Sequence, residues 1–189
     1  MCAKLLVCTP PSDDIEKVLE PNSKYNWYVF YTHPRAEKIA LREIQVRGYN
    51  AFLPTYRTYR VWKNRKKVWV EHVLFPSYVF VNTTESNIFD IKRIPKIVTV
   101  VHTAGIPSII PESEINALQN FLNSDHEVTV ETSFNKGDNV RITQGPLAGH
   151  EGILQEKKGK TRFGIYLKEI NHAVFIDICA NMLDKIECF

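Results

Sequence analysis

The chain carries a strongly basic segment between Tyr56 and His72. Six basic residues stand there against the single acid Glu71, whereas all 189 residues have a formal net charge of only +3. The six are Arg57, Arg60, Lys63, Arg65, Lys66 and Lys67. Guanidinium and ammonium groups neutralise phosphates, so this concentration of charge is typical of a surface that binds nucleic acid. A solvated hairpin tip would also be charged, so the pattern alone leaves both interpretations open.

Aromatic residues are interleaved with these cations. Tyr59, Trp62 and Trp69 have rings that can stack on unpaired bases, a contact that tolerates any base sequence. Trp62 and Trp69 also flank the turn from Lys63 to Lys67, where a cross-strand aromatic pair would stabilise a hairpin. The cross-strand pair is the favoured hypothesis for the tryptophans, and nucleic acid is the favoured partner of the basic set.

No residues have the sequence spacing of a catalytic or metal site. The six histidines are scattered, and the four cysteines form no C-x-x-C pair and no cluster with histidine. The serine-nucleophile elbow, the phosphate-binding loop and the H-E-x-x-H motif are all absent from the sequence. The sequence therefore predicts a protein that is not an enzyme and uses no metal and no cofactor.

The composition, with 44% hydrophobic and 24% charged residues, is that of a globular protein. The length allows one or two small domains. No apolar run reaches the length of a membrane span, and the patch at 5–7 is too short for a signal peptide. We expect a monomeric cytoplasmic protein with no membrane partner and with reduced cysteines.

A proline-led aromatic strand, Phe75 to Val81, follows the basic segment directly. Side chains alternate between the two faces of a strand, so Tyr78 and Phe80 share one face while Val79 and Val81 can fill the core. The aromatic face suits a protein partner, although aromatics lying beneath a helix would show the same pattern.

The elements before and after this strand predict an α+β sandwich, with helices against a mostly antiparallel sheet. Trp27 to Tyr31 is apolar on both faces, so this strand is expected to be central. The other expected elements are a helix after Thr32 that ends at Gly48, an extended segment at 50–56, a hairpin at 56–72, a short helix at 86–94, a strand at 97–102 and a helix that begins at Pro111. This first domain is expected to span 25–123, after a flexible extension at 1–24.

The last third of the chain has a different pattern. Residues 124–133 are polar and lack a helical period, which predicts a linker. From 134 to 189, short apolar strands separated by glycines predict a small all-β barrel.

Both halves resemble the NusG family of transcription elongation factors. The stretches 27–29, 52–54 and 75–81 resemble its N-terminal NGN domain, and 137–142 with 145–152 resemble its KOW motif. The two signatures occur in the family's order. Three features favour specialised paralogues, such as RfaH and the UpxY antiterminators of capsular polysaccharide operons. They are the basic hairpin, the N-terminal extension and Ser77, which stands where the housekeeping factor usually has glycine.

The resemblance implies a scaffolding function. The family's NGN domain binds the clamp helices of the largest subunit of RNA polymerase and suppresses pausing and termination, in specialised paralogues at specific operons such as those for polysaccharide biosynthesis. Positions that match the docking face are Tyr31, Tyr78 and Phe80. The hairpin would lie near upstream or non-template DNA.

The family's KOW barrel binds ribosomal protein S10 or Rho, and the matching positions are Leu147 and Ile170. An exposed apolar side chain at a turn tip suits a partner contact, although it can equally tuck back onto the barrel. In RfaH the C-terminal domain can refold into a helical hairpin. Here the glycine- and proline-rich turns and the β-branched strands predict a barrel that does not refold. The alternative functions are a housekeeping NusG-type elongation factor and a ribosome-associated KOW RNA-binding protein.

Overall fold

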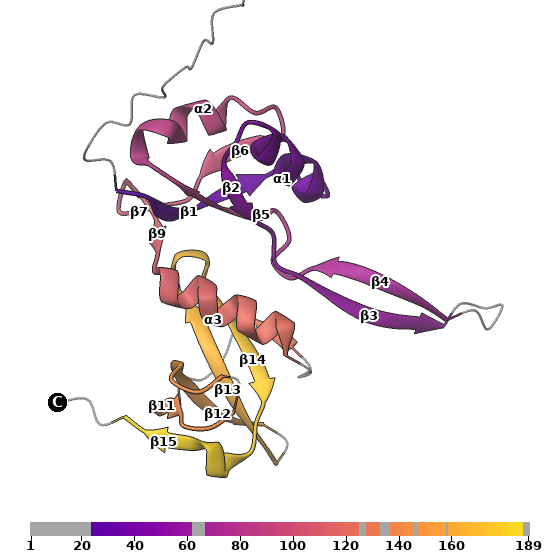
Figure 1. Cartoon of the computed structure of the whole chain (residues 1–189), viewed down its shortest axis with the longest axis vertical. Helices are drawn as coiled ribbons and strands as arrows, with labels where there is room; N and C mark the ends of the chain where they lie inside the picture. The colour runs from indigo at the N-terminus through magenta and orange to yellow at the C-terminus, as the bar shows by residue number, and fades with distance from the viewer. Residues whose placement is uncertain are drawn as a thin grey trace, which may run out of the picture.

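A computed structural model describes residues 24–61, 67–124, 128–132, 137–145, 147–157 and 159–186 of the protein. Its first part is an α+β domain, from which a β-hairpin projects, and its last part is a β domain below one helix of the first (Figure 1). Within the described ranges, no helix is both long and apolar enough to cross a membrane.

The first domain is built on an antiparallel sheet with the strand order β2-β5-β1-β6, and a further short strand, β9, also pairs with β1. The strands are β1 (Asn26–Thr32), β2 (Asn50–Phe52), β5 (Tyr78–Thr83), β6 (Ile97–Val100) and β9 (Ile109–Ile110). Two helices, α1 (Glu37–Val46) and α2 (Ile88–Lys92), cover one face, and α3 (Glu112–Asn123) covers the other.

Strand β1 lies at the centre of this domain, as its sequence predicts. Tyr28 and Phe30 pack with α1 and α2 in one hydrophobic cluster, while Trp27 and Val29 belong to the cluster around α3. All four side chains are buried. Apolar residues on both faces are typical of a strand covered on both sides, which makes the sheet a rigid platform for the residues at its ends.

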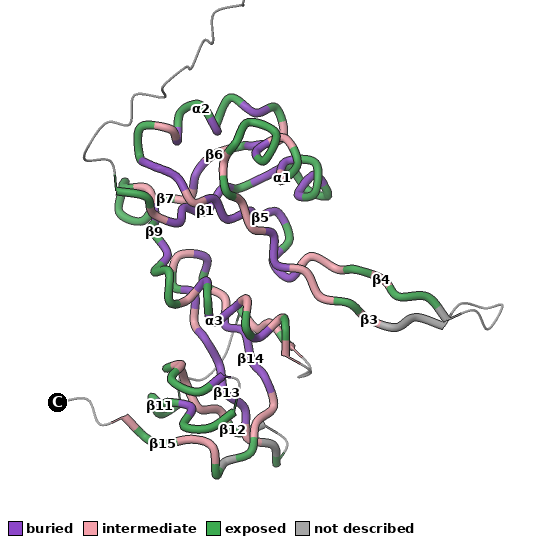
Figure 2. The backbone as a smooth tube through the Cα atoms, in the orientation of Figure 1, coloured by how far each residue is buried: buried purple, intermediate pink, exposed green. Residues whose placement is uncertain are grey.

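The basic segment forms the expected hairpin, whose strands are β3 (Thr55–Val61) and β4 (Lys67–Val73). It extends away from both domains, and Figure 2 shows its described residues as exposed or half-buried. The remaining short elements are η1 (Glu85–Asn87), β7 (His102–Thr103) and β8 (Ile106–Pro107). The helix expected at 86–94 therefore consists of a 3-10 turn followed by α2.

The second domain is a curled antiparallel sheet with the strand order β10-β14-β13-β12-β11-β15. The strands are β10 (Val128–Glu131), β11 (Asn139–Ile142), β12 (Glu151–Lys157), β13 (Lys160–Leu167), β14 (His172–Asp177) and β15 (Leu183–Lys185), with 3-10 turns η2 (Lys168–Ile170) and η3 (Ala180–Met182). Strand β10 lies inside the segment expected to be a linker, so that expectation is wrong there. Its alternating Val-Thr-Val residues pair with β14, a partner far along the chain.

The barrel packs against α3, so the two domains share one hydrophobic core. The ring centroids of Phe121 on α3 and Phe163 on β13 lie 5.8 Å apart, edge to face. Beside them, the amide nitrogen of Asn120 lies 3.0 Å from Nε2 of His150. Buried residues line the parts of β13 and β14 that face the helix (Figure 2).

Candidate functional site

Tyr31 and Tyr78 form an aromatic pair on neighbouring strands. The register of β1 and β5 places them directly opposite each other. Their ring centroids are 5.5 Å apart and their planes are inclined by 67°. Tyr31 is 37% exposed and Tyr78 is half-buried, so both rings rest on the sheet and remain partly open to solvent. Rigid, partly exposed tyrosines are typical anchors of protein interfaces.

Phe80, which was expected on the same docking face, is 0% exposed. Its ring lies between Phe52 and Phe75, with centroid distances of 6.2 and 6.0 Å. The expectation that Phe80 is open to a partner is therefore wrong in this structure. It does share a face with Tyr78, but α3 covers this part of that face and converts Phe80 into core.

His172 brings the second domain to the edge of the aromatic pair. Its ring, at the start of β14, lies edge to face with Phe75 at 5.5 Å and with Tyr78 at 6.0 Å. The barrel therefore contacts one side of the Tyr78 ring. In the sequence, His172 is one of several scattered histidines. No local pattern predicts its contact with Tyr78 on β5, which lies far away in the chain.

The base of the hairpin is fixed to α1 through its acidic residue. The carboxylate of Glu71 accepts a hydrogen bond from the Lys38 ammonium group and another, of 3.2 Å, from the hydroxyl of Thr55. The hydrogen bond from Lys38 lowers the pKa of Glu71. The acid of the segment is thus paired with a helix residue, where the base of the hairpin meets α1.

The structure describes only part of the expected nucleic-acid surface. Arg57 is exposed on β3. The backbones of Arg60 and Lys67 lie in the hairpin ladder. The other predicted residues, Lys63, Arg65 and Lys66, lie outside the described residues, as does Trp62.

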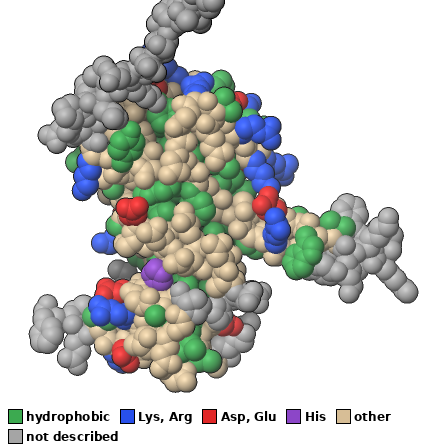
Figure 3. All heavy atoms as spheres, in the orientation of Figure 1, with side chains coloured by type: hydrophobic (Ala, Val, Ile, Leu, Met, Phe, Trp, Pro, Cys, Tyr) green, Lys and Arg blue, Asp and Glu red, His purple; other side chains and the backbone are tan. Residues whose placement is uncertain are grey.

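Basic residues on α1 extend this surface, although the sequence did not predict it. Lys38 and Arg42 lie one helical turn apart, and both are exposed. Figure 3 shows Lys and Arg side chains over α1 and at the base of the hairpin. The signal was the spacing of four residues within a predicted helix, which becomes informative only when the helix is known to lie beside the hairpin.

The aromatics of the hairpin stem lie differently from the expected tryptophan pair. The register places Trp69 opposite Tyr59, not opposite another tryptophan. Trp69 is 66% exposed. Nearer the sheet, the rings of Tyr56 and His72 stack at 5.4 Å. A broad indole that faces solvent beside basic residues can stack on an unpaired base.

The two expected partner-binding residues of the barrel, Leu147 and Ile170, are only 3% and 6% exposed. The expectation of an exposed Leu147 is therefore wrong. Gly145 and Gly149, both with positive φ, fold the turn back, and the Gly149 N–H donates to the Ile142 carbonyl at 2.7 Å. Both side chains belong to the core that the barrel shares with α3.

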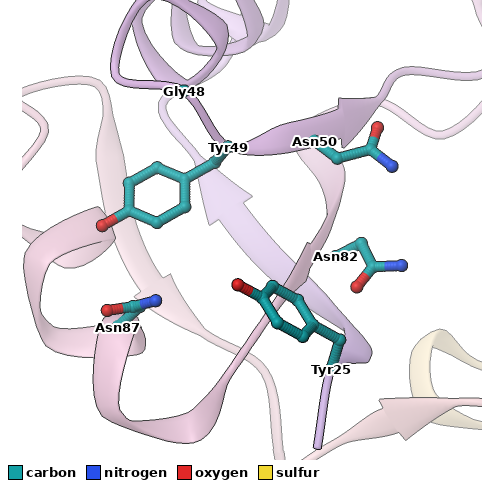
Figure 4. Close-up of a pocket in the computed structure, with 6 residues that line it drawn as sticks. All are labelled: Tyr25, Gly48, Tyr49, Asn50, Asn82 and Asn87. Carbon is teal, nitrogen blue, oxygen red and sulfur yellow. The ribbon is translucent and has the colours of Figure 1, made fainter. Parts of the chain in front are cut away.

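A small hollow lies at the end of β2 and β5 away from the hairpin (Figure 4). It is lined by Tyr25, Gly48, Tyr49, Asn50, Asn82 and Asn87. Burial, above all, raises the pKa of the Tyr49 phenol. Neutral amides and phenols dominate this lining, which is a poor setting for activating a nucleophile.

These surfaces define a two-domain binding protein, with an aromatic face, a basic hairpin and a β-barrel. A family model described as "NusG: Transcription termination factor nusG" matches residues 25–119. That match covers just over half of the 189 residues, so the chain belongs to the NusG family.

Curated relatives agree with this family. The "Transcription termination/antitermination protein NusG" of Rickettsia prowazekii (strain Madrid E) is 28% identical over 187 residues, spanning 90% of this chain and 96% of that protein. The protein of the same name from Halalkalibacterium halodurans is 24% identical over 177 residues, spanning 85% and 98%. The chain is accordingly a NusG-type transcription factor.

A solved structure described as "Domain interaction in Thermotoga maritima NusG" has the same fold. Its TM-score is 0.51 at 20% identity, over 87% of this chain and 98% of that chain. The expected α+β architecture, a sandwich domain followed by a small β domain, is confirmed.

Proposed function

We propose that this protein is a transcription elongation and antitermination factor that docks on the clamp helices of the largest subunit of RNA polymerase. The observation that carries the proposal is the Tyr31–Tyr78 pair, partly exposed on two strands of a rigid sheet. A protein that binds two parts of the polymerase across its cleft favours the closed clamp by differential affinity, which disfavours pausing and termination.

The hairpin is the second surface of this proposal, directed at upstream or non-template DNA. Phosphate contacts come from the exposed Arg57, from the basic residues beyond it and from Arg42 on the adjoining α1. Trp69 provides a stacking ring. The strongly basic hairpin also supports a specialised factor acting at particular operons, such as those for polysaccharide biosynthesis. Polymerase occupancy across a genome distinguishes this from a housekeeping factor, which would track most genes.

The barrel is proposed to bind ribosomal protein S10 or Rho through Leu147 and Ile170. Both side chains are buried in the core shared with α3. A partner that uses them therefore requires the barrel to move away from α3. In this account the contact between the domains limits access of the partner to the barrel.

Alanine at Tyr31 or at Tyr78 is expected to weaken binding to isolated clamp helices at least about tenfold each, because each change removes a rigid anchor from the interface centre. Val46, 81% exposed on α1, provides the control, and Val46→Ala should bind like the wild type. Titration of labelled clamp helices measures the three affinities. Equal binding by all variants would contradict the proposed docking face.

Replacing Arg65, Lys66 and Lys67 with alanine is expected to reduce crosslinking to non-template DNA. The slope of log affinity against log salt concentration should become shallower by about one for each lost phosphate contact. The control is alanine at Lys92, the last residue of α2, and at Lys96, four residues later. Crosslinking to a stalled elongation complex at several salt concentrations is the measurement. The hairpin assignment fails if the triple variant retains both crosslinking and antitermination.

A further inference from the structure

A buried carboxylate at the start of α1 contacts the turn that precedes the docking strand. Glu37 is 6% exposed, although glutamate is almost never fully buried unless it has a partner. Its Oε1 accepts a hydrogen bond from the backbone N–H of Ser77 at 2.8 Å. The first turn of a helix favours a negative charge, and an N–H that donates to a carboxylate forms a strong bond.

Ser77 has a backbone conformation that favours glycine. Its φ is +67°, in the left-handed region. Both of its backbone groups are bound: the N–H donates to Glu37, and the carbonyl accepts from the N–H of Thr32 at 2.8 Å. The turn from Phe75 to Ser77 is therefore held in a strained conformation by α1 on one side and by the end of β1 on the other.

This turn sets the position of the docking pair. Ser77 directly precedes Tyr78, and Thr32 directly follows Tyr31. The hydrogen bond between Thr32 and Ser77 thus joins the two strands immediately beside the tyrosine rings. A change in the conformation of Ser77 would rotate Tyr78 relative to Tyr31.

We propose that Glu37 is a positioning residue for polymerase docking: its carboxylate compensates the left-handed strain at Ser77 and so fixes the orientation of Tyr78. The inference rests on the proposed docking function. It predicts that Glu37 contributes to clamp-helix binding only while residue 77 is strained, since glycine adopts the left-handed conformation without a compensating hydrogen bond.

Four variants test this dependence: Glu37→Ala, Glu37→Gln, Ser77→Gly and the double variant Glu37→Ala with Ser77→Gly. We expect Glu37→Ala to weaken clamp-helix binding about tenfold, as for a lost docking anchor. Glutamine retains an acceptor oxygen, so the affinity of Glu37→Gln for clamp helices should stay within about threefold of that of the wild type. The double variant should recover most of the binding. Glu43→Ala, on the same helix, is the control and should have no effect.

Nuclear magnetic resonance provides a readout that does not depend on polymerase. The amide proton of residue 77 should exchange slowly in the wild type and Glu37→Gln, and fast in Glu37→Ala, which should also lose contacts between the Tyr31 and Tyr78 rings. If the wild type fails to bind clamp helices, the docking function fails, while these signals still test the positioning. The inference is overturned if Glu37→Ala keeps the ring contacts, or if the double variant is as impaired as Glu37→Ala.

Discussion

Glu114→Gln is expected to strengthen the contact between the barrel and α3 at neutral pH by about ten- to a hundredfold. Glu114 on α3 lies close to Glu169 of the barrel, and each carboxylate has a buried oxygen with no hydrogen-bond partner among the described residues. Burial, and then repulsion by Glu169, opposed by Lys168, raises the pKa of Glu114 from 4.5 to about 7. Solvent screens this half-buried pair, so we expect less than the full shift implies.

The sign of the pH dependence follows from this shift. When the barrel leaves α3, the pKa of Glu114 returns toward 4.5, so closing the contact takes up a proton. The contact is therefore strongest below about pH 4.5, weakens as the pH rises to about 7 and changes little above that. Glutamine mimics the protonated acid and should remove the dependence.

Energy transfer between labels on α2 and on the barrel measures the closed fraction as a function of pH. Glu112→Gln is the matched control, because Glu112 is exposed in the first turn of the same helix. It should behave like the wild type. A closed fraction in Glu114→Gln that still depends on pH in this range would contradict the role of the carboxylate pair.

Phe80→Ala is expected to lower the free energy of unfolding of the first domain by about 3–5 kcal/mol, the usual effect of removing a fully buried phenylalanine ring. Phe80 is 0% exposed and lies between the rings of Phe52 and Phe75. Tyr31→Ala, at a side chain 37% exposed, should cost much less stability. Urea unfolding of each variant measures the difference.

Phe80→Leu separates packing from docking, because leucine refills most of the space and should retain most of the stability and binding. If Phe80→Leu kept full stability but lost clamp-helix binding, Phe80 would be a direct contact after all. The burial of Phe80 beneath α3 would then have to be relieved on binding.

Local patterns predict much of this fold. The two apolar faces of β1 and the pairing of β3 with β4 depend on neighbouring residues, and both are found in the expected place. The start of α1 is not: the helix begins at Glu37, whereas Thr32 is the last residue of β1. The other errors concern long-range packing. Strand β10 is defined by pairing with β14, and Phe80 is buried because α3 crosses its face.

The candidate site was predicted less completely than the fold. The sequence indicates Tyr31 and Tyr78 through the resemblance to NusG, and the structure places them side by side. It could not indicate His172, whose contact with Tyr78 depends on how the two domains meet. It could not indicate the hydrogen bond between Glu37 and Ser77 either, since that bond joins two elements that lie 40 residues apart in the chain.

The central claim is that the Tyr31–Tyr78 face meets the clamp helices during transcription. The most direct test places a photoreactive phenylalanine analogue at position 31 and irradiates a transcribing complex, with the same analogue at position 46 as the control. We predict that position 31 crosslinks to the clamp helices of the largest subunit and that position 46 does not. A crosslink from position 31 to another protein, or to none while the factor remains bound and active, would contradict the account.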